Sequence, residues 1–143
     1  MSYPVLELAK YIVSKCIKEK HPITNLQLQK ILYCVQRDFL QKLDKLAFPE
    51  SIEAWAFGAV VPEVYYYFSS AGAMHITLCG EPVQSISDNE RKLIDSITES
   101  KRDKTPWDFA NETNKQGGAW DTVFDGGKGN KSVIPTEKIQ TLG

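Results

Sequence analysis

The chain has 143 residues, of which 42% are hydrophobic and 24% charged, and its 17 basic and 18 acidic side chains leave a net charge of -1. This length fits a single domain over residues 1–143, in which folding removes roughly two-thirds of the surface of the unfolded chain from water. The near-zero charge argues against a protein that binds nucleic acid through bulk charge, and no apolar run approaches the length of a membrane span.

Apolar side chains predict two helices in the first 45 residues. From Val5 they recur at the i, i+3, i+4 spacing of one buried face, and we expect this helix to end near His21, before Pro22. A second helix begins after Thr24, whose hydroxyl forms a capping box with Gln27. Its buried stripe is predicted to comprise Leu28, Ile31, Leu32, Val35, Phe39 and Leu43, widened by Leu26, Tyr33 and Leu40. The width of this stripe indicates contacts on more than one side, which predicts a central helix.

A short extended segment over residues 52–57 is predicted, because small apolar side chains alternate there with larger or charged ones. Gly58 marks the turn after it. Pro62 suits the first position of a third helix, with Glu63 near the positive end of the helix dipole. The residues of this helix that are predicted to face inward are Val64, Tyr65 and Phe68.

The middle of the chain has a less regular pattern. Residues 75–79 fit either a short strand or a packed loop, and the sequence leaves both open. Beyond them, Ser87 and Glu90 are predicted to form a second capping box. It opens an amphipathic helix that is expected to end between Lys101 and Lys104.

The last third of the chain contains two short predicted helices. One begins at Pro106, with Trp107 and Phe109 as its anchors in the core. Residues 117–129 are rich in glycine and are predicted to lack regular structure. The last helix begins at Pro135. Together the elements predict a mostly α fold, a compact bundle of about five or six helices with a minor short β element.

The cysteines and the N-terminus indicate the compartment. Cys16, Cys34 and Cys79 are too far apart for metal-ligand spacing. The first fifteen residues carry Glu7 and Lys10 among their apolar side chains, unlike the uninterrupted apolar core of a signal peptide. We therefore expect a cytoplasmic protein with reduced cysteines, the first two of which pack in the core.

No constellation of side chains predicts catalysis. His21 lies beside a helix end, His75 has no recognisable partner, and most carboxylates fall on solvated helix faces. The segment from Asp125 to Ser132 compares with the phosphate-binding pattern G-x-x-x-x-G-K-S but lacks both glycines. We therefore expect no catalytic residue, no metal and no cofactor.

A helix-turn-helix is the main alternative that the residues alone suggest. Residues 5–39 would supply the two helices, and the side chains expected to contact bases would be Asn25, Gln27, Gln29 and Lys30. Against it, the turn is long and contains Pro22, the second helix is unusually apolar, and the domain has no basic field.

Aromatic residues are dense between residues 55 and 68. Tyr65, Tyr66 and Tyr67 point about 100° apart on a helix, so at least one of them is exposed. Exposed aromatic rings often anchor protein interfaces. The other reading is that these rings cover the core while their hydroxyls reach water, and both readings stay open.

Two blocks of the chain resemble the Panacea antitoxin domain, a family also described as SocA-like or as phage-associated GepA-like proteins. The blocks are ITNLQLQKILYCVQRDFL (residues 23–40) and IEAWAFGAVVPEVYYYF (residues 52–68). A weaker similarity covers Trp107 to Trp120 and the terminal VIPTEKI (residues 133–139). Two positions depart from the family pattern: Ala59 stands in place of a proline, and Asn114 in place of a histidine.

Within these blocks and the later similarity we assign two sets of residues. The structural motif comprises Lys30, Tyr33, Trp55, Gly58, Pro62 and Trp120. Within it, Gly58 and Pro62 are predicted to shape the bend, and Trp55 and Tyr33 to pack it. The residues predicted to bind a partner are Glu63, Tyr66 and Tyr67.

The resemblance implies a mostly helical cytoplasmic antitoxin that neutralises a cognate toxin by direct binding. One branch of the family also delivers its toxin to a protease as an adaptor. Two other functions remain as alternatives: a phage or prophage protein that binds a host or defence factor, and a DNA-binding regulator. The partner is thus expected to be a protein. No membrane is expected to be involved, a nucleic acid partner is disfavoured, and the oligomeric state is not predicted.

Overall fold

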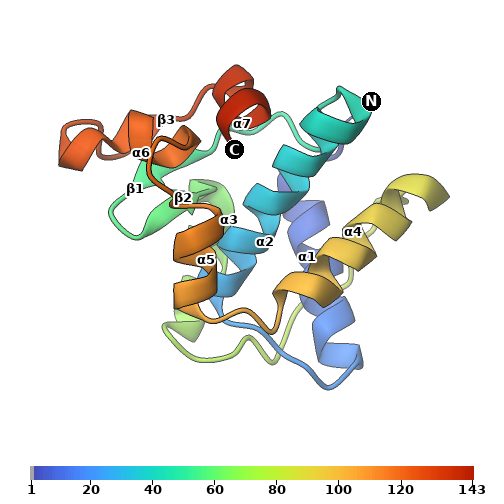
Figure 1. The fold of residues 1–143 in the computed structure, drawn as a ribbon. Helices are drawn as coiled ribbons and strands as arrows, with labels where there is room; N and C mark the ends of the chain where they lie inside the picture. Colours follow the sequence, from blue (N-terminus) through green and yellow to red (C-terminus); the bar gives the residue numbers. More distant parts are fainter. Residues whose placement is uncertain (1) are drawn as a thin grey trace.

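Helix α2 (Asn25–Asp38) runs through the middle of the fold and continues into a π-helical turn at Phe39–Leu43 (Figure 1). The computed structural model describes residues 2–143, and these form seven α-helices and a three-stranded sheet. The other elements are α1 (Val5–Lys18), β1 (Glu53–Trp55), β2 (Gly58–Val60), α3 (Pro62–Tyr67), α4 (Asp88–Lys101), α5 (Pro106–Glu112), α6 (Ala119–Phe124), β3 (Ser132–Val133) and α7 (Thr136–Leu142). The fold is mostly α with a minor β element, as predicted.

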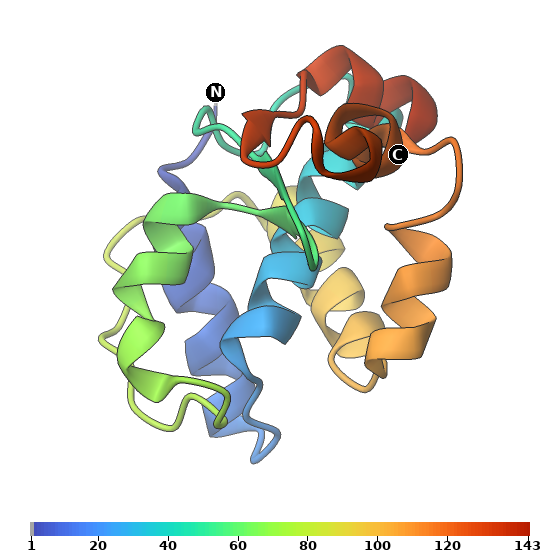
Figure 2. The same ribbon diagram turned by 90° about the vertical axis from the view of Figure 1, so that its left-hand side faces the viewer.

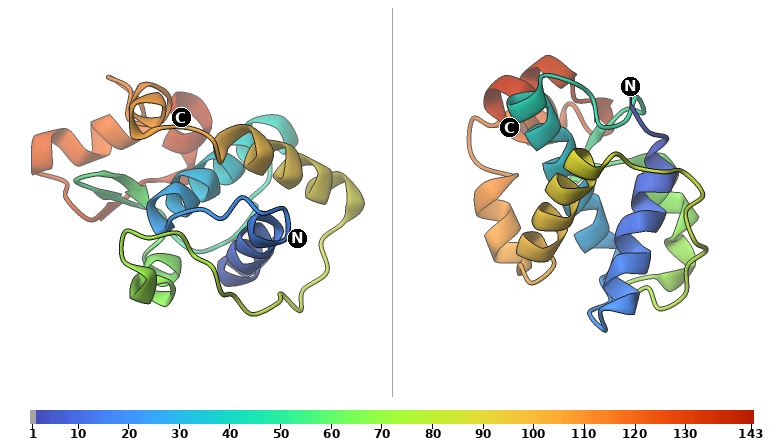
Figure 3. Two further views of the ribbon diagram at one scale, coloured as in Figure 1. Left: turned by 90° about the horizontal axis from the view of Figure 1, so that it is seen from below. Right: turned by 90° about the vertical axis from the view of Figure 1, so that its right-hand side faces the viewer.

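The other elements surround α2. Helices α1, α3, α4 and α7 and strand β2 all contact it. Figure 2 shows α1 and α3 on one flank of α2 and α5 on the other, and Figure 3 shows α4 lying alongside α2 between α1 and α5. The prediction of a central helix is therefore confirmed.

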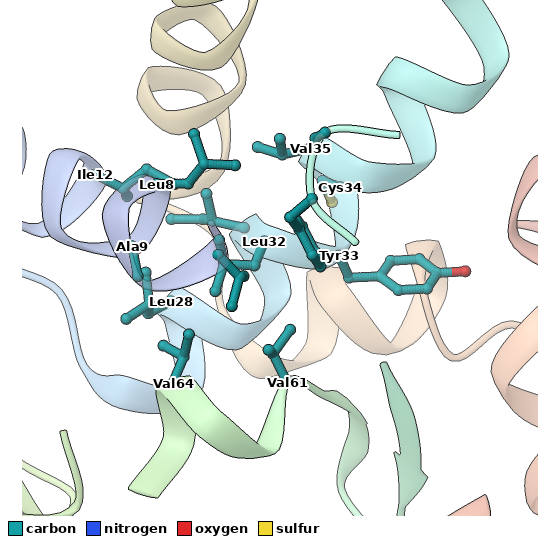
Figure 4. Close-up of a cluster of buried hydrophobic side chains, with 14 of the residues drawn as sticks. Leu8, Ala9, Ile12, Leu28, Leu32, Tyr33, Cys34, Val35, Val61 and Val64 are labelled. Carbon is teal, nitrogen blue, oxygen red and sulfur yellow. The ribbon is translucent and has the colours of Figure 1, made fainter. Parts of the chain in front are cut away.

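The core forms where α1, α2 and the start of α3 meet. Leu8 and Ile12 of α1, Leu28 of α2, and Val61 and Val64 at the start of α3 belong to one cluster of buried side chains (Figure 4). All five side chains are buried. Burying a side chain of this size stabilises the fold by about 1.5–3 kcal/mol, so this cluster is a main source of stability.

The sheet is antiparallel, with the strand order β2-β1-β3. Trp55 pairs with Gly58, so the hairpin turn occupies residues 56–57. Gly58, predicted to mark the turn, instead begins β2. The φ of Gly58 is 130°, a backbone conformation that residues with a side chain rarely adopt, so glycine suits this position.

The first capping box is confirmed and the second is wrong. The hydroxyl of Thr24 accepts a hydrogen bond from the backbone N–H of Gln27, and the Gln27 side chain accepts one from the backbone N–H of Thr24. At α4, Ser87 is the N-cap but makes no side-chain cap bond. Glu90 accepts hydrogen bonds from the Tyr3 hydroxyl and the Lys45 ammonium, because a charged donor competes well with a backbone N–H.

Three apolar residues predicted to be buried are exposed: Leu26, Leu43 and Trp107. Leu26 lies in the first turn of α2, where it lines a surface hollow beside Phe57. Leu43 ends the π-helical turn, whose wider winding rotates it away from the buried stripe. Trp107 is 79% exposed because it lies about 200° around α5 from Phe109, which is the buried anchor.

The glycine-rich stretch contains regular structure that its composition did not predict. Helix α6 occupies the residues between Gly118 and Asp125, and a short 3-10 turn follows at Asp125–Gly127. Gly129 then lies so close to the backbone oxygen of Val123 that a Cβ there would be 1.8 Å from it. This tight return lets β3 reach the free edge of β1.

The remaining open segment, residues 75–79, is a loop. A single bridge between His75 and Thr24 joins it to the start of α2. Cys16 and Cys34 are buried, as expected for packing residues. Within residues 2–143, no helix is both long enough and apolar enough to cross a bilayer.

Candidate protein-interaction site

Four aromatic side chains from the hairpin and α3 form a continuous cluster, which we call the aromatic patch: Trp55, Phe57, Tyr65 and Tyr66. The centroid of the Trp55 ring lies 5.9 Å from that of Phe57, 5.3 Å from that of Tyr65 and 6.0 Å from that of Tyr66. Trp55 is buried, whereas Phe57 and Tyr66 are exposed. The patch therefore consists of a buried ring that supports exposed rings in tilted and edge-on contacts.

The three residues predicted to bind a partner share one face of α3. Glu63, Tyr66 and Tyr67 have the i, i+3, i+4 spacing of neighbours on a helix surface, and all three are exposed. Tyr66 leans into the aromatic patch. Tyr67 packs against the Phe68 ring at 4.9 Å and lies 5.5 Å from the Lys10 ammonium of α1. The two tyrosines thus cover opposite sides of the same face.

Buried polar side chains of α2 hold this site in place, and we call Asn25, Gln29 and Lys30 the polar brace. Asn25 donates a hydrogen bond to the backbone oxygen of Tyr65 over 2.9 Å. Gln29 accepts one from the backbone N–H of Val61 and donates one to Asn25, each over 2.9 Å. Such buried networks, when their groups are paired, fix a single geometry.

Lys30 reaches the hairpin turn. Its Nζ donates a hydrogen bond to the backbone oxygen of Phe57 over 2.8 Å. A Cβ on residue 58 would lie 1.8 Å from this Nζ, so only Gly58 leaves room for the ammonium. Burial lowers the pKa of Lys30 to about 8. Two residues of the predicted structural motif, Lys30 and Gly58, are therefore brought into direct contact.

Two residues of the C-terminal third of the chain, Trp120 and Lys131, contact Trp55. The indole N–H of Trp120 donates a hydrogen bond to the backbone oxygen of Trp55 over 2.8 Å. The Lys131 ammonium lies 5.0 Å from the Trp55 ring centroid, which is within the range of a cation–π contact. Pro62 occupies the first position of α3, as predicted.

Tyr33, which also belongs to the predicted structural motif, is buried on the side of α2 that faces α7. Figure 4 shows its ring pointing away from the other labelled core residues. Its hydroxyl lies 2.8 Å from where a Cβ on Gly143 would be, and it has no hydrogen-bond partner among residues 2–143. Tyr33 therefore packs against the end of the described chain.

The geometry of α2 argues against the helix-turn-helix alternative. That alternative requires Asn25, Gln29 and Lys30 to be accessible to bases, but each is at most 4% exposed and bonds to the protein itself. Their role in bracing the hairpin was not predicted. The signal in the sequence was the i, i+4 and i+5 spacing of these three polar residues within α2.

Comparisons with known proteins agree on one family. The family model described as antitoxin SocA-like, Panacea domain, matches residues 28–121. Antitoxin SocA from Caulobacter vibrioides (strain NA1000 / CB15N) is 38% identical over 69 residues, which cover 48% of this chain and 37% of that protein. The similarity therefore spans well under two-thirds of the relative's own length. No solved structure matches the chain.

Proposed function

The chain belongs to the antitoxin SocA-like Panacea domain family, and on that premise we propose that it neutralises a protein toxin by binding it directly. The proposed contact surface is the exposed face of α3 with the adjoining aromatic patch. The observation that carries this proposal is the exposure of Tyr66 and Tyr67, at 59% and 51%. Large aromatic residues dominate the binding energy of many protein interfaces.

The rigidity of this surface supports the proposal. The polar brace fixes the backbone of the hairpin and α3, and Trp55 supports the ring of Tyr66. A surface that is already ordered loses less conformational freedom when it binds, which favours affinity. Glu63 lies between the two tyrosines and forms no ion pair within residues 2–143, so its carboxylate is available to a basic group of the partner.

A co-expression assay tests this function. The gene beside this one is expressed alone, with the wild-type chain, and with the double variant Tyr66→Ala/Tyr67→Ala. We expect the wild type to restore growth and the double variant to fail. Trp107→Ala is the matched control, because Trp107 is an aromatic residue on a different helix and is even more exposed than the two tyrosines. A harmless neighbouring gene, or full protection by the double variant, would contradict the proposal.

The lifetime of the toxin separates two ways of neutralising it. If the chain only blocks the toxin, the toxin accumulates as a stable complex that the tagged chain recovers. If the chain is an adaptor for a protease, the toxin disappears faster when the chain is present. A pulse-chase measurement in the same strains distinguishes these outcomes.

A further inference from the structure

The Lys30 ammonium lacks an anionic partner. Lys30 is 4% exposed, and the one hydrogen bond that its ammonium makes within the described residues goes to the uncharged backbone oxygen of Phe57. An ammonium has three N–H donors, and no carboxylate lies within 4.0 Å of this one among residues 2–143. A buried charge is costly unless it is paired, so this position favours an anion from outside the chain.

A cavity of about 360 Å³ adjoins Lys30. Leu26, Phe57 and Phe109 supply apolar walls, and Asn114 lines it as well. The volume falls within the range of small-molecule sites, which are mostly apolar with a few polar groups. A second hollow of about 500 Å³ shares Leu26 and Phe57 with it, so apolar surface continues beyond its mouth.

The charges around this cavity have one sign. Lys104 lines it in addition to Lys30, whereas none of the described residues that line it is Asp or Glu. Oxygen-seeking metal ions therefore find no carboxylate ligand here. The combination of a buried cation, a second lysine and apolar walls selects an anion with an apolar body.

We propose that this cavity binds a small organic anion, whose carboxylate or phosphate group pairs with Lys30 and whose flat apolar body lies against Leu26, Phe57 and Phe109. The site is separate from the tyrosine face of α3, and the proposal does not rest on toxin binding. The burial of Lys30 lowers its pKa to about 8, so the side chain is still mostly protonated at pH 7 and is available as a cation.

The architecture of the site explains why it is preformed. Gly58 leaves the space that the Lys30 ammonium occupies. Gln29 holds the end of β2 in place through its hydrogen bond from the Val61 N–H. The apolar walls come from α2, the hairpin turn and α5. A ligand therefore meets Lys30 already in position and does not have to order it.

The test is a titration of the full chain with three probes of similar size: benzoate, phenyl phosphate and neutral benzamide. We expect benzoate or phenyl phosphate to bind saturably, with a Kd on the order of 1 mM or tighter, and benzamide to bind much more weakly. Amide signals of Phe57, Gly58 and Asn114 should move in NMR spectra. The better of the two anions then identifies the head group as carboxylate or phosphate.

Variants decide whether Lys30 is the anchor. Lys30→Met keeps the apolar stem and removes the charge, and it should weaken anion binding about thirtyfold or more. Lys104→Met is the matched control and should weaken it only a few-fold. The proposal is overturned if neither anion binds saturably, if benzamide binds as well, or if Lys30→Met binds as tightly as the wild type.

A measurement on the wild type covers the case in which Lys30→Met does not fold. The side-chain nitrogen of Lys30 is followed by ¹⁵N NMR through a pH titration with and without the bound probe. Pairing with an anion should raise the pKa of Lys30. An unchanged titration of Lys30 at saturating probe would also overturn the proposal.

Discussion

The side-chain oxygen of Gln29 accepts a hydrogen bond from the backbone N–H of Val61 over 2.9 Å, and neither residue reaches water. The Gln29 amide group also donates to Asn25, which in turn holds the backbone oxygen of Tyr65. One helix turn of α2 thereby fixes both ends of α3. The direction in which the α3 tyrosines face follows from this network.

Replacing Gln29 with leucine should destabilise the fold. The variant leaves the Val61 N–H and the side-chain oxygen of Asn25 without their partner, and a buried unsatisfied group costs about 1–3 kcal/mol. Urea unfolding measures the loss. Gln84→Leu is the matched control, because Gln84 is exposed and its side chain makes no hydrogen bond within the described chain, so a change below about 0.5 kcal/mol is expected. Equal losses at both sites would contradict this role.

Gly58→Ala should cost more than a glycine substitution elsewhere. The new methyl group would meet the Lys30 ammonium at 1.8 Å in a backbone conformation of positive φ, and we expect a loss of about 2–4 kcal/mol. Gly72→Ala separates the two causes, since Gly72 also has a positive φ but no atom within 4 Å of an added Cβ. Its cost should be about 1 kcal/mol.

A double-mutant cycle tests the contact between Gly58 and Lys30 itself. In a Lys30→Ala background the ammonium is gone, so Gly58→Ala should lose only its backbone cost. If the two substitutions are additive, the close approach does not determine the requirement for glycine.

Lys30 should make the stability depend on pH in the alkaline range. Burial lowers its pKa from 10.5 to about 8, so between these values the unfolded chain binds more protons and stability rises with pH. Below pH 8 the folded protein carries the full free-energy cost of burying the Lys30 charge. This cost decreases as the pH rises and is gone above pH 10.5. Relative to Lys30→Met, the wild type should gain about 2 kcal/mol between pH 7 and pH 10.

Unfolding in urea at several pH values measures this difference. Lys92→Met is the control, because Lys92 is exposed on α4, and its pH profile should run parallel to that of the wild type. A Lys30→Met profile that also runs parallel to the wild type would show that the burial of Lys30 does not disfavour its charge.

Glu112 should contribute stability that is lost in acid. Its carboxylate on α5 accepts hydrogen bonds from Lys101 of α4 over 2.5 Å and from Arg37 of α2 over 3.1 Å. Burial raises the pKa of Glu112, but these two cations outweigh burial and lower it overall. The contribution is therefore complete above the ordinary pKa of about 4.3 and falls as the pH drops through the lowered value.

Glu112→Gln should cost about 1–3 kcal/mol at pH 7, because it leaves the partly buried Lys101 without a charge partner and leaves Arg37 with Asp38 alone. The difference from the wild type should shrink below pH 4, which thermal or urea unfolding measures. Glu137→Gln, at an exposed position on α7, is the control. A loss that is independent of pH would mean that shape rather than charge holds the three helices together.

Local sequence signals predicted the helices well where a local interaction determines them. The Thr24 capping box, the buried stripe of α1 and Pro62 at the start of α3 each depend on residues within a few positions. The second capping box failed because Glu90 is bound by Lys45 and Tyr3, far away in sequence. Spacing alone contains no information on such partners.

The same limit explains what was missed at the candidate site. The exposure of the α3 tyrosines follows from helix geometry, but the polar brace depends on the hairpin returning to α2, which no local pattern reports. From sequence alone, Asn25, Gln29 and Lys30 suggest contact with solvent or a ligand, because their backbone partners in the hairpin and α3 are not visible in the sequence. The prediction that Trp107 anchors α5 was wrong because the sequence of so short a helix does not indicate which of its faces packs against the core.

The polar brace has an evolutionary consequence, because every bond it makes to the hairpin and α3 ends on a main-chain atom. The bonds from Asn25, Gln29 and Lys30 go to the backbone of residues 65, 61 and 57, respectively, and do not involve the side chains of those residues. Substitutions at Phe57, Tyr65 and Tyr66 can therefore accumulate without loosening the framework. The exposed side chains can therefore change to suit a different partner while these main-chain hydrogen bonds keep the framework in place.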